Sequence, residues 1–175
     1  MQDKTYLSTL IDYNTWANEV TYSDVSKLPA EEITKKRETP LQSIYVSLHH
    51  LLNVDNIWLG HMQGQSHDYQ TLRDVKFEEF DALWAARRKM DKTLSDYVAS
   101  LSTDDLGEIV DYELIGGNSG SMSRAMCLTH LVTHGSYHRG WISDMFGQTD
   151  QMQPSADIPV YERALREAGK PPMPV

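Results

Sequence analysis

Two groups of histidines stand out in the sequence, one at residues 49–50 and one at residues 130–138. His134 and His138 are four residues apart, so on a helix both imidazoles project from one face, one turn apart. Two imidazoles placed in this way can chelate one divalent metal ion, as in the helical H-x-x-x-H pattern of zinc enzymes. Gly135 lies between them, where a missing side chain leaves room beside the ligands. The pair indicates a metal site, although paired histidines on helices also occur as surface or core residues.

A third ligand is available from the first group. The midpoint of a helix expected over Pro40–Met62 lies beside His50, and the midpoint of a helix expected over Ser123–Phe146 lies beside His134. At about 1.5 Å per residue, the two histidines lie at similar depth whether the helices run parallel or antiparallel. Three neutral imidazoles leave at least one coordination position open, as in catalytic zinc sites. The alternative is a set of histidines hydrogen-bonded in a polar bundle interior.

Two neighbouring histidines are less suited to the same ion. A rotation of about 100° per residue turns His49 away from His50, toward solvent, a neighbouring helix or a partner chain. His130 precedes His134 by one turn, but successive i, i+4 steps drift by about 40° around the helix axis. Three such residues cannot face one ion equally well. We therefore expect His130 to support a ligand or to pack in the core.

Other polar residues have structural and functional interpretations. His61 and His67 flank a loop and are expected to be solvated. Asp12 and Asp55 could orient a ligating imidazole through its second nitrogen, but the ordinary expectation for each is a helix-surface acid. Arg139 could hold an anionic substrate, and a structural ion pair is the favoured interpretation.

Four tryptophans and one cysteine complete the candidates. The tryptophans could wall a pocket, but in a bundle we expect aromatic side chains to belong to the core; they are Trp16, Trp58, Trp84 and Trp141. Cys127 lies about two turns before His134 and is interpreted as a packing residue. As the only cysteine, it excludes an internal disulfide.

The elements that must position these groups are amphipathic helices, because apolar residues recur at helical spacing in four segments. The sequence predicts long helices at Asp3–Lys27, Pro40–Met62, Lys76–Ser100 and Ser123–Phe146. Pro29 ends the first, because the residue before proline is pushed out of the α region. Thr39 and Pro40 begin the second, and Ser121 or Ser123 caps the fourth. Four apolar stripes are buried together most simply in an all-α four-helix bundle.

Shorter elements join these helices. Ser102–Asp105 is predicted as a turn or short capped helix. Ile109–Ile115 is rich in β-forming residues and runs into Gly116–Gly120, which indicates a short hairpin or structured crossover before the fourth long helix, with an ordered loop as the alternative. After the bundle we expect a linker at Gln148–Pro154, a short C-terminal helix at Asp157–Ala168 and an irregular tail at Lys170–Pro174.

Composition limits the partners. A length of 175 residues fits a single domain over residues 1–175. Sixteen basic and twenty-five acidic side chains give a formal net charge of −9, which argues against nucleic-acid binding and against docking on anionic lipid. No signal-peptide pattern is found, and no apolar run approaches the roughly 20 residues of a membrane span. We expect a soluble, cytoplasmic protein.

Three segments resemble motifs of the DinB/YfiT-like family. The first is Tyr13–Asn18, and the second begins at His50 and carries Trp58 eight residues later. The third ends in His138-Arg139-Gly140. Together they occur in the family's order and at its separations, and the resemblance covers nearly the whole chain.

The resemblance implies a four-helix bundle, usually homodimeric, that binds zinc, nickel or another divalent metal through histidines falling on His50, His134 and His138. This chain departs from the family at Trp141, where glutamine is common, so a polar role at that position is in doubt. Characterised members of the wider superfamily include transferases and isomerases that use low-molecular-weight thiols. The resemblance thus implies thiol-dependent group transfer on a small-molecule substrate, in detoxification or stress response. Metal-dependent hydrolysis and a non-catalytic metal-binding stress-response protein are the alternatives, and no catalytic base is assigned.

Overall fold

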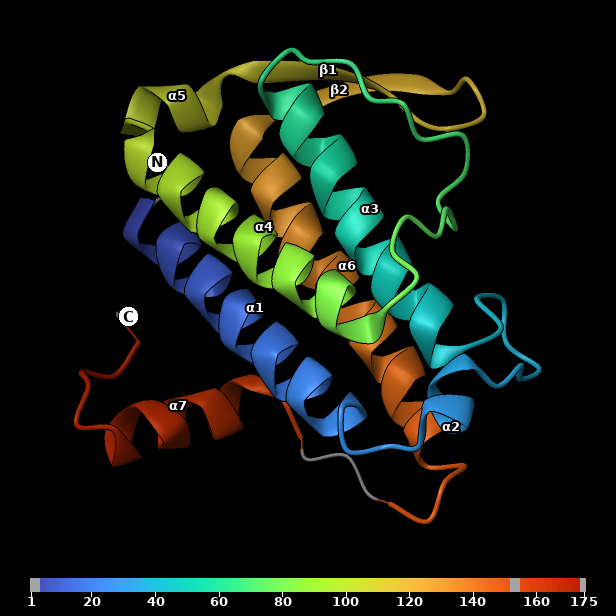
Figure 1. Cartoon of the computed structure of the whole chain (residues 1–175). Helices are drawn as coiled ribbons and strands as arrows, with labels where there is room; N and C mark the ends of the chain where they lie inside the picture. Colours follow the sequence, from blue (N-terminus) through green and yellow to red (C-terminus); the bar gives the residue numbers. More distant parts are fainter. Residues whose placement is uncertain (1–3, 152–154, 174–175) are drawn as a thin grey trace.

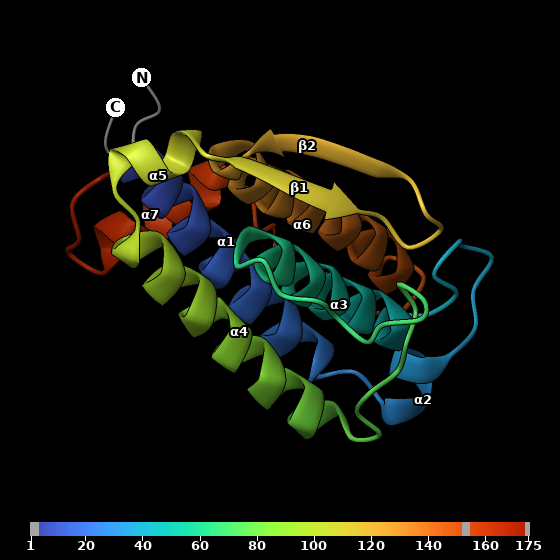
Figure 2. The same cartoon turned by 90° about the horizontal axis from the view of Figure 1, so that it is seen from above.

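The computed structural model describes residues 4–151 and 155–173. Four long helices form its body: α1 (Lys4–Val25), α3 (Ile44–Met62), α4 (Phe80–Ser100) and α6 (Arg124–Phe146). Helix α1 runs antiparallel to α4, and α3 runs antiparallel to α6 (Figures 1 and 2). Their apolar faces meet in one core, so the predicted all-α four-helix bundle is confirmed. No helix within the described ranges is long and apolar enough to cross a membrane.

The predicted hairpin is present. Strands β1 (Ile109–Glu113) and β2 (Ser119–Ser123) pair antiparallel, and the turn between them contains Gly116 and Gly117 at φ 112° and 88°. These are backbone conformations that side chains rarely adopt, which explains the glycines. The hairpin lies along the outside of α6, beside the end of α3 (Figure 2).

Three short helices complete the fold. Helix α5 (Thr103–Gly107) begins with the reciprocal capping bonds of Ser102 and Asp105, as the predicted capped segment requires. Helix α7 (Ile158–Glu167) forms at the predicted C-terminal position and packs on α1. Helix α2 (Ala30–Thr34) was not expected. Parts of the predicted first helix, linker and tail, at Asp3, residues 152–154 and Pro174, lie outside the described residues.

The second long helix begins later than the sequence predicts. Thr39 and Pro40 do not start it; they begin a turn in which the amide of Gln42 donates to the Thr39 carbonyl at 3.0 Å. Proline suits the second position of such a turn as well as it suits a helix start. Helix α3 starts at Ile44, where the Ser43 hydroxyl accepts a hydrogen bond from the Val46 amide. The expected start at Thr39-Pro40 is therefore wrong.

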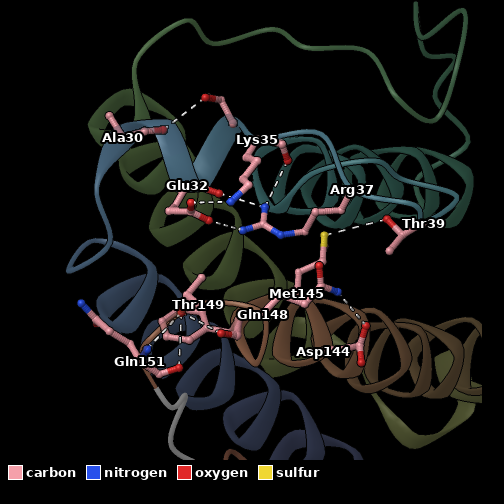
Figure 3. A network of polar contacts seen from close by, with 12 residues as sticks. Ala30, Glu32, Lys35, Arg37, Thr39, Asp144, Met145, Gln148, Thr149 and Gln151 are labelled. Carbon is pink, nitrogen blue, oxygen red and sulfur yellow. Dashed lines mark hydrogen bonds and ion pairs between the residues drawn. The ribbon is translucent and has the colours of Figure 1, made fainter.

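The turn is held in place by the residues around it. The Arg37 guanidinium contacts the carboxylate of Glu32 at 2.7 Å and donates to two main-chain carbonyls, while the Thr39 hydroxyl reaches the sulfur of Met145 at 3.9 Å (Figure 3). The connection from α1 to α3 is thereby fixed against the end of α6.

The third long helix also begins later, at Phe80 instead of Lys76. Residues 63–79, hereafter the return segment, carry the chain back beside α3 to the start of α4 (Figure 1). Two side chains of α3 form hydrogen bonds with the main chain of Phe77. The Tyr45 hydroxyl donates to the Phe77 carbonyl at 2.7 Å, and the His49 ring accepts from the Phe77 amide at 3.3 Å. These contacts hold the main chain of Phe77 against α3, and α4 begins only at Phe80, so the predicted start at Lys76 is wrong.

Candidate metal centre

Three imidazoles meet between α3 and α6. His134 and His138 lie one turn apart on α6, and His50 faces them from the middle of α3. The Nε2 atom of His50 lies 3.1 Å from Nε2 of His134 and 3.1 Å from Nε2 of His138. One nitrogen from each ring can be chosen so that all three lie within 4.8 Å of one another. The structure thus brings together the three histidines that the sequence singled out.

The spacing of these atoms fits a bound metal ion. Ligand nitrogens at about 2.0–2.1 Å from a tetrahedral ion are about 3.3 Å apart, close to the two observed separations. The Nδ1 atom of His50 lies 3.1 Å from the Leu72 carbonyl, so it carries the proton and leaves Nε2 as a lone pair. One lone pair cannot accept well-aligned hydrogen bonds from both of the other rings. A cation at the centre would satisfy all three nitrogens.

Burial keeps these imidazoles neutral, which is the form that binds metals. Burial and the neighbouring imidazoles lower the pKa of His134 to about 2. Burial, together with His50, lowers the pKa of His138 to about 4. Burial also lowers the pKa of His50, against the opposing effect of the Leu72 carbonyl.

These shifts predict how the metal-free chain responds to acid. A histidine whose pKa is lowered by folding stabilises the protein above its unfolded pKa of about 6.5, and this stability is lost as the pH falls, because the unfolded chain binds the proton. Between about pH 6.5 and pH 4 we expect the free energy of unfolding to fall by about 1 kcal/mol per pH unit for each of His134 and His138. Denaturant unfolding at several pH values measures this. His134→Gln should reduce the slope, and an unchanged slope would contradict the assignment.

The comparisons with known proteins agree with this fold. The model of the DinB family matches residues 1–172. The chain belongs to the DinB family. Protein DinB of Bacillus subtilis (strain 168) is 26% identical over 162 residues, which are 87% of this chain and 91% of that protein. The crystal structure of a DinB-like protein from Bacillus cereus ATCC 10987 has a TM-score of 0.64 at 17% identity, covering 83% of this chain and 94% of the other.

The other mid-helix histidines of this DinB protein lie outside the three-histidine cluster. His49 is fully buried and is held by the Tyr45 carbonyl at 3.0 Å and by the amide of Phe77. We expected His49 to face solvent, a neighbouring helix or a partner chain. It does not face solvent, because the return segment covers its ring. His130 packs against Trp58, with ring centroids 4.8 Å apart, and lies 5.4 Å from the ring of His134. It packs beside a candidate ligand, as expected.

The expected solvation of His61 and His67 is only partial. Both side chains are half-buried, with their ring centroids 5.7 Å apart. The return segment folds back after α3 and brings His67 against His61, a contact that local sequence does not reveal. This pair lies apart from the three-histidine cluster.

Arg139 is structural, but the expected ion pair is wrong. One of its guanidinium nitrogens, Nη1, donates to Oδ1 of Asn14 at 2.7 Å and to Oδ1 of Asn18 at 2.9 Å. Both asparagines belong to the DinB first-helix motif, and their role was missed in the sequence. Two polar residues four apart on the buried face of α1 were the available signal, since buried amides need partners.

Gly135 provides space for this contact rather than for the metal ligands. A Cβ atom at Gly135 would lie 2.6 Å from Oδ1 of Asn14 and 2.8 Å from Nη1 of Arg139. The interpretation of this glycine as room beside the ligands is therefore wrong.

Gly135→Ala should lower the free energy of unfolding by about 1–3 kcal/mol, because overpacking forces the buried side chains apart. The matched control is Gly140→Ala on the same helix, where an added Cβ meets nothing within 4 Å. That change should stabilise the helix by up to about 1 kcal/mol. Equal effects of the two variants in chemical denaturation would contradict this account.

The two candidate supporting acids do not reach the cluster. Asp55 is buried and pairs with Arg87 at 2.7 Å, so its expected place on the helix surface is wrong. Asp12 is exposed on α1. Among the hydrogen bonds and ion pairs found in the described ranges, none joins either carboxylate to the three histidines. The Leu72 carbonyl takes that role for His50.

The aromatic residues divide between core and site. Trp141 packs edge-on against His138 with ring centroids 4.9 Å apart, which places an aromatic ring beside a candidate ligand. Trp16 lies against Tyr161 of α7. Trp84 donates to Glu19 at 3.1 Å. Burial raises the pKa of Cys127 to about 11, in keeping with its interpretation as a packing residue.

A cavity of about 680 Å³ lies beside His134, between α3, α6 and the hairpin. Trp58 lines it from α3, and His130, Thr133 and His134 line it from α6. A small molecule in this cavity would lie next to the three-histidine cluster.

Proposed function

We propose that this chain binds one divalent metal ion through His50, His134 and His138, and that it uses the site for thiol-dependent group transfer. The observation that carries the proposal is the convergence of three neutral Nε2 atoms at separations that suit one ion. Imidazole nitrogens suit zinc and nickel as well as copper and iron, and the family resemblance makes zinc or nickel the proposed ion. The motif resemblance to the DinB family implies the same ligand set.

The residues around the cluster favour transfer over hydrolysis. When bound, such an ion lowers the pKa of a thiol or water that coordinates it. Hydrolysis by zinc enzymes commonly uses a carboxylate as general base, as in the H-E-x-x-H pattern. Within the described residues, no Asp or Glu lines the cavity beside His134. Transfer from a thiol needs no such base once the thiol has lost its proton.

Metal analysis followed by an activity assay tests the proposal. The purified full chain should contain about one zinc or nickel ion, and a chelator should remove it. Conjugation of a low-molecular-weight thiol to 1-chloro-2,4-dinitrobenzene should then fall on chelation and return when the metal is restored. Stoichiometric metal without chelator-sensitive conjugation would favour a binding protein over an enzyme. A chain that takes up no metal would overturn the proposal.

The homodimer implied by the family resemblance remains a prediction. Sedimentation of the full chain, with and without metal, measures it directly.

A further inference from the structure

The walls of the cavity beside His134 are apolar. Ile57 and Trp58 of α3 face Met122 and Met126, which come from the hairpin and α6, and the return segment contributes Leu72. Met126 is 52% exposed and Leu72 38% exposed, so both present apolar surface that the chain itself leaves uncovered. The cavity volume of about 680 Å³ lies within the range of small-molecule sites, about 300–1,000 Å³.

The same cavity has few polar groups in its wall, and they include the imidazoles of His130 and His134 and the hydroxyls of Tyr112, Thr129 and Thr133. In the part of the chain that the structure describes, no Lys, Arg, Asp or Glu lines it. The hydroxyl groups of Thr129 and Thr133 are already used, since they donate to main-chain carbonyls of α6 at 2.9 and 3.1 Å. A carboxylate or ammonium placed here would lose water and meet only neutral polar groups, with no side chain of opposite charge to compensate it, which is costly. The lining therefore selects an uncharged body.

The cavity and the three-histidine cluster are continuous. His134 belongs to both, and its neighbour His130 also lines the cavity. Leu72 joins them as well, because its carbonyl bonds His50 while its side chain lines the cavity. A larger cavity, of about 760 Å³, lies between α1 and α7 and has no histidine in its lining. The cavity beside His134 is therefore placed to present a bound molecule to the cluster.

We propose that this cavity binds the apolar, uncharged body of a small-molecule substrate, whose reacting group lies at the three-histidine cluster. The inference rests on the proposed function for the reacting group, whereas the preference for an uncharged apolar body rests on the cavity alone. Charged parts of a thiol cofactor are expected to remain outside it. Two methionines in the wall allow the cavity to adapt to bodies of different shape.

Calorimetric titration of the full chain tests the inference with three probes. Naphthalene is an apolar, uncharged molecule without a metal-binding group. Naphthalene-2-thiol adds a thiol to the same apolar rings, and mercaptosuccinate carries a thiol next to two charged carboxylates. We expect naphthalene to bind with or without metal. On the metal-loaded chain, naphthalene-2-thiol should bind at least about tenfold more tightly than mercaptosuccinate.

Matched variants locate the binding. Met126→Glu places a carboxylate in the wall and should weaken naphthalene binding by about tenfold or more. Ile109→Glu is the control, because Ile109 is 67% exposed on β1 and does not line the cavity. Metal content should be unchanged in both variants.

The two proposals can fail separately. If the chain proves unable to take up metal but binds naphthalene in a Met126-dependent manner, the proposed function is overturned and the inference about the cavity is supported. A metal-loaded chain that binds mercaptosuccinate as tightly as naphthalene-2-thiol would overturn the inference. An unchanged affinity of the Met126→Glu chain for naphthalene would also overturn the inference. A change in oligomeric state in place of the loss of naphthalene binding would overturn it too, because the cavity would then be part of a protein interface.

Discussion

The His50→Ala chain is expected to lose its divalent metal while remaining folded. Removal of one of three ligands leaves two imidazoles on α6, and a pair on one helix holds an ion far less firmly than three converging nitrogens. Loss of an outer partner of a ligand already costs about 10–100-fold in metal affinity, so loss of the ligand itself should exceed about 100-fold. Metal content after dialysis and competition with a chromophoric chelator measure the change.

His49→Ala is the matched control for this experiment. It removes a buried imidazole from the next position of α3, but the ring of His49 is held by Tyr45 and Phe77 and lies outside the cluster. We expect lower stability with nearly unchanged metal affinity. A larger loss of metal from His49→Ala than from His50→Ala would show that the ligand has been misassigned.

Arg87→Met should give the largest loss of stability of any substitution considered. Arg87 is 1% exposed, and its guanidinium lies 2.7 Å from Asp55 and 2.9 Å from Asp91. Burial raises the pKa of Asp91 to about 6 even with Arg87 in place. Without Arg87 two buried carboxylates lack their cation, and breaking a buried pair in this way costs about 3–5 kcal/mol. Denaturant unfolding measures the loss.

The adjacent residue supplies the control. Arg88 is exposed and pairs with Glu19 at the surface, so Arg88→Met should change the free energy of unfolding by no more than about 1 kcal/mol. Adding Asp55→Asn and Asp91→Asn to Arg87→Met removes the uncompensated charges and should restore much of the stability. If Arg87→Met lowers the free energy of unfolding by no more than Arg88→Met does, the buried ion pairs contribute less to stability than expected.

The bundle and the histidine cluster could be predicted because their signals are local. The period of apolar residues marks the long helices, and the spacing of His134 and His138 fixes a shared face. His50 and His134 lie near the midpoints of their helices and therefore at similar depth, and the family resemblance distinguishes His50 from His49.

The remaining features depend on contacts between residues distant in sequence. Arg87 meets Asp55, and Asn18 donates to Asp91 at 2.9 Å while accepting from Arg139 at 2.9 Å. With the pair of Arg87 and Asp91 inside α4, these contacts join α1, α3, α4 and α6 in one buried polar network, in which the pairs between different helices are 32 to 125 residues apart in the sequence. No local spacing marks such partners, which is why Asp55 was expected at the surface.

The late starts of α3 and α4 have a related cause. Pro40 suits both a helix start and a turn, and only the contacts of Arg37 and Thr39 decide between them. Phe77 is kept out of α4 by side chains of α3. Tertiary contacts thus set the boundaries that propensity alone left open.

Leu72 contacts both the three-histidine cluster and the cavity beside His134. Its carbonyl fixes the ring of His50, and its side chain lines the cavity beside His134. Every amino acid supplies a carbonyl, so a substitution at this position would change the wall of the cavity and leave the hydrogen bond to His50 in place. A change in the length of the return segment would move the carbonyl itself. Relatives with different substrates are therefore expected to differ here by substitution and to agree in spacing.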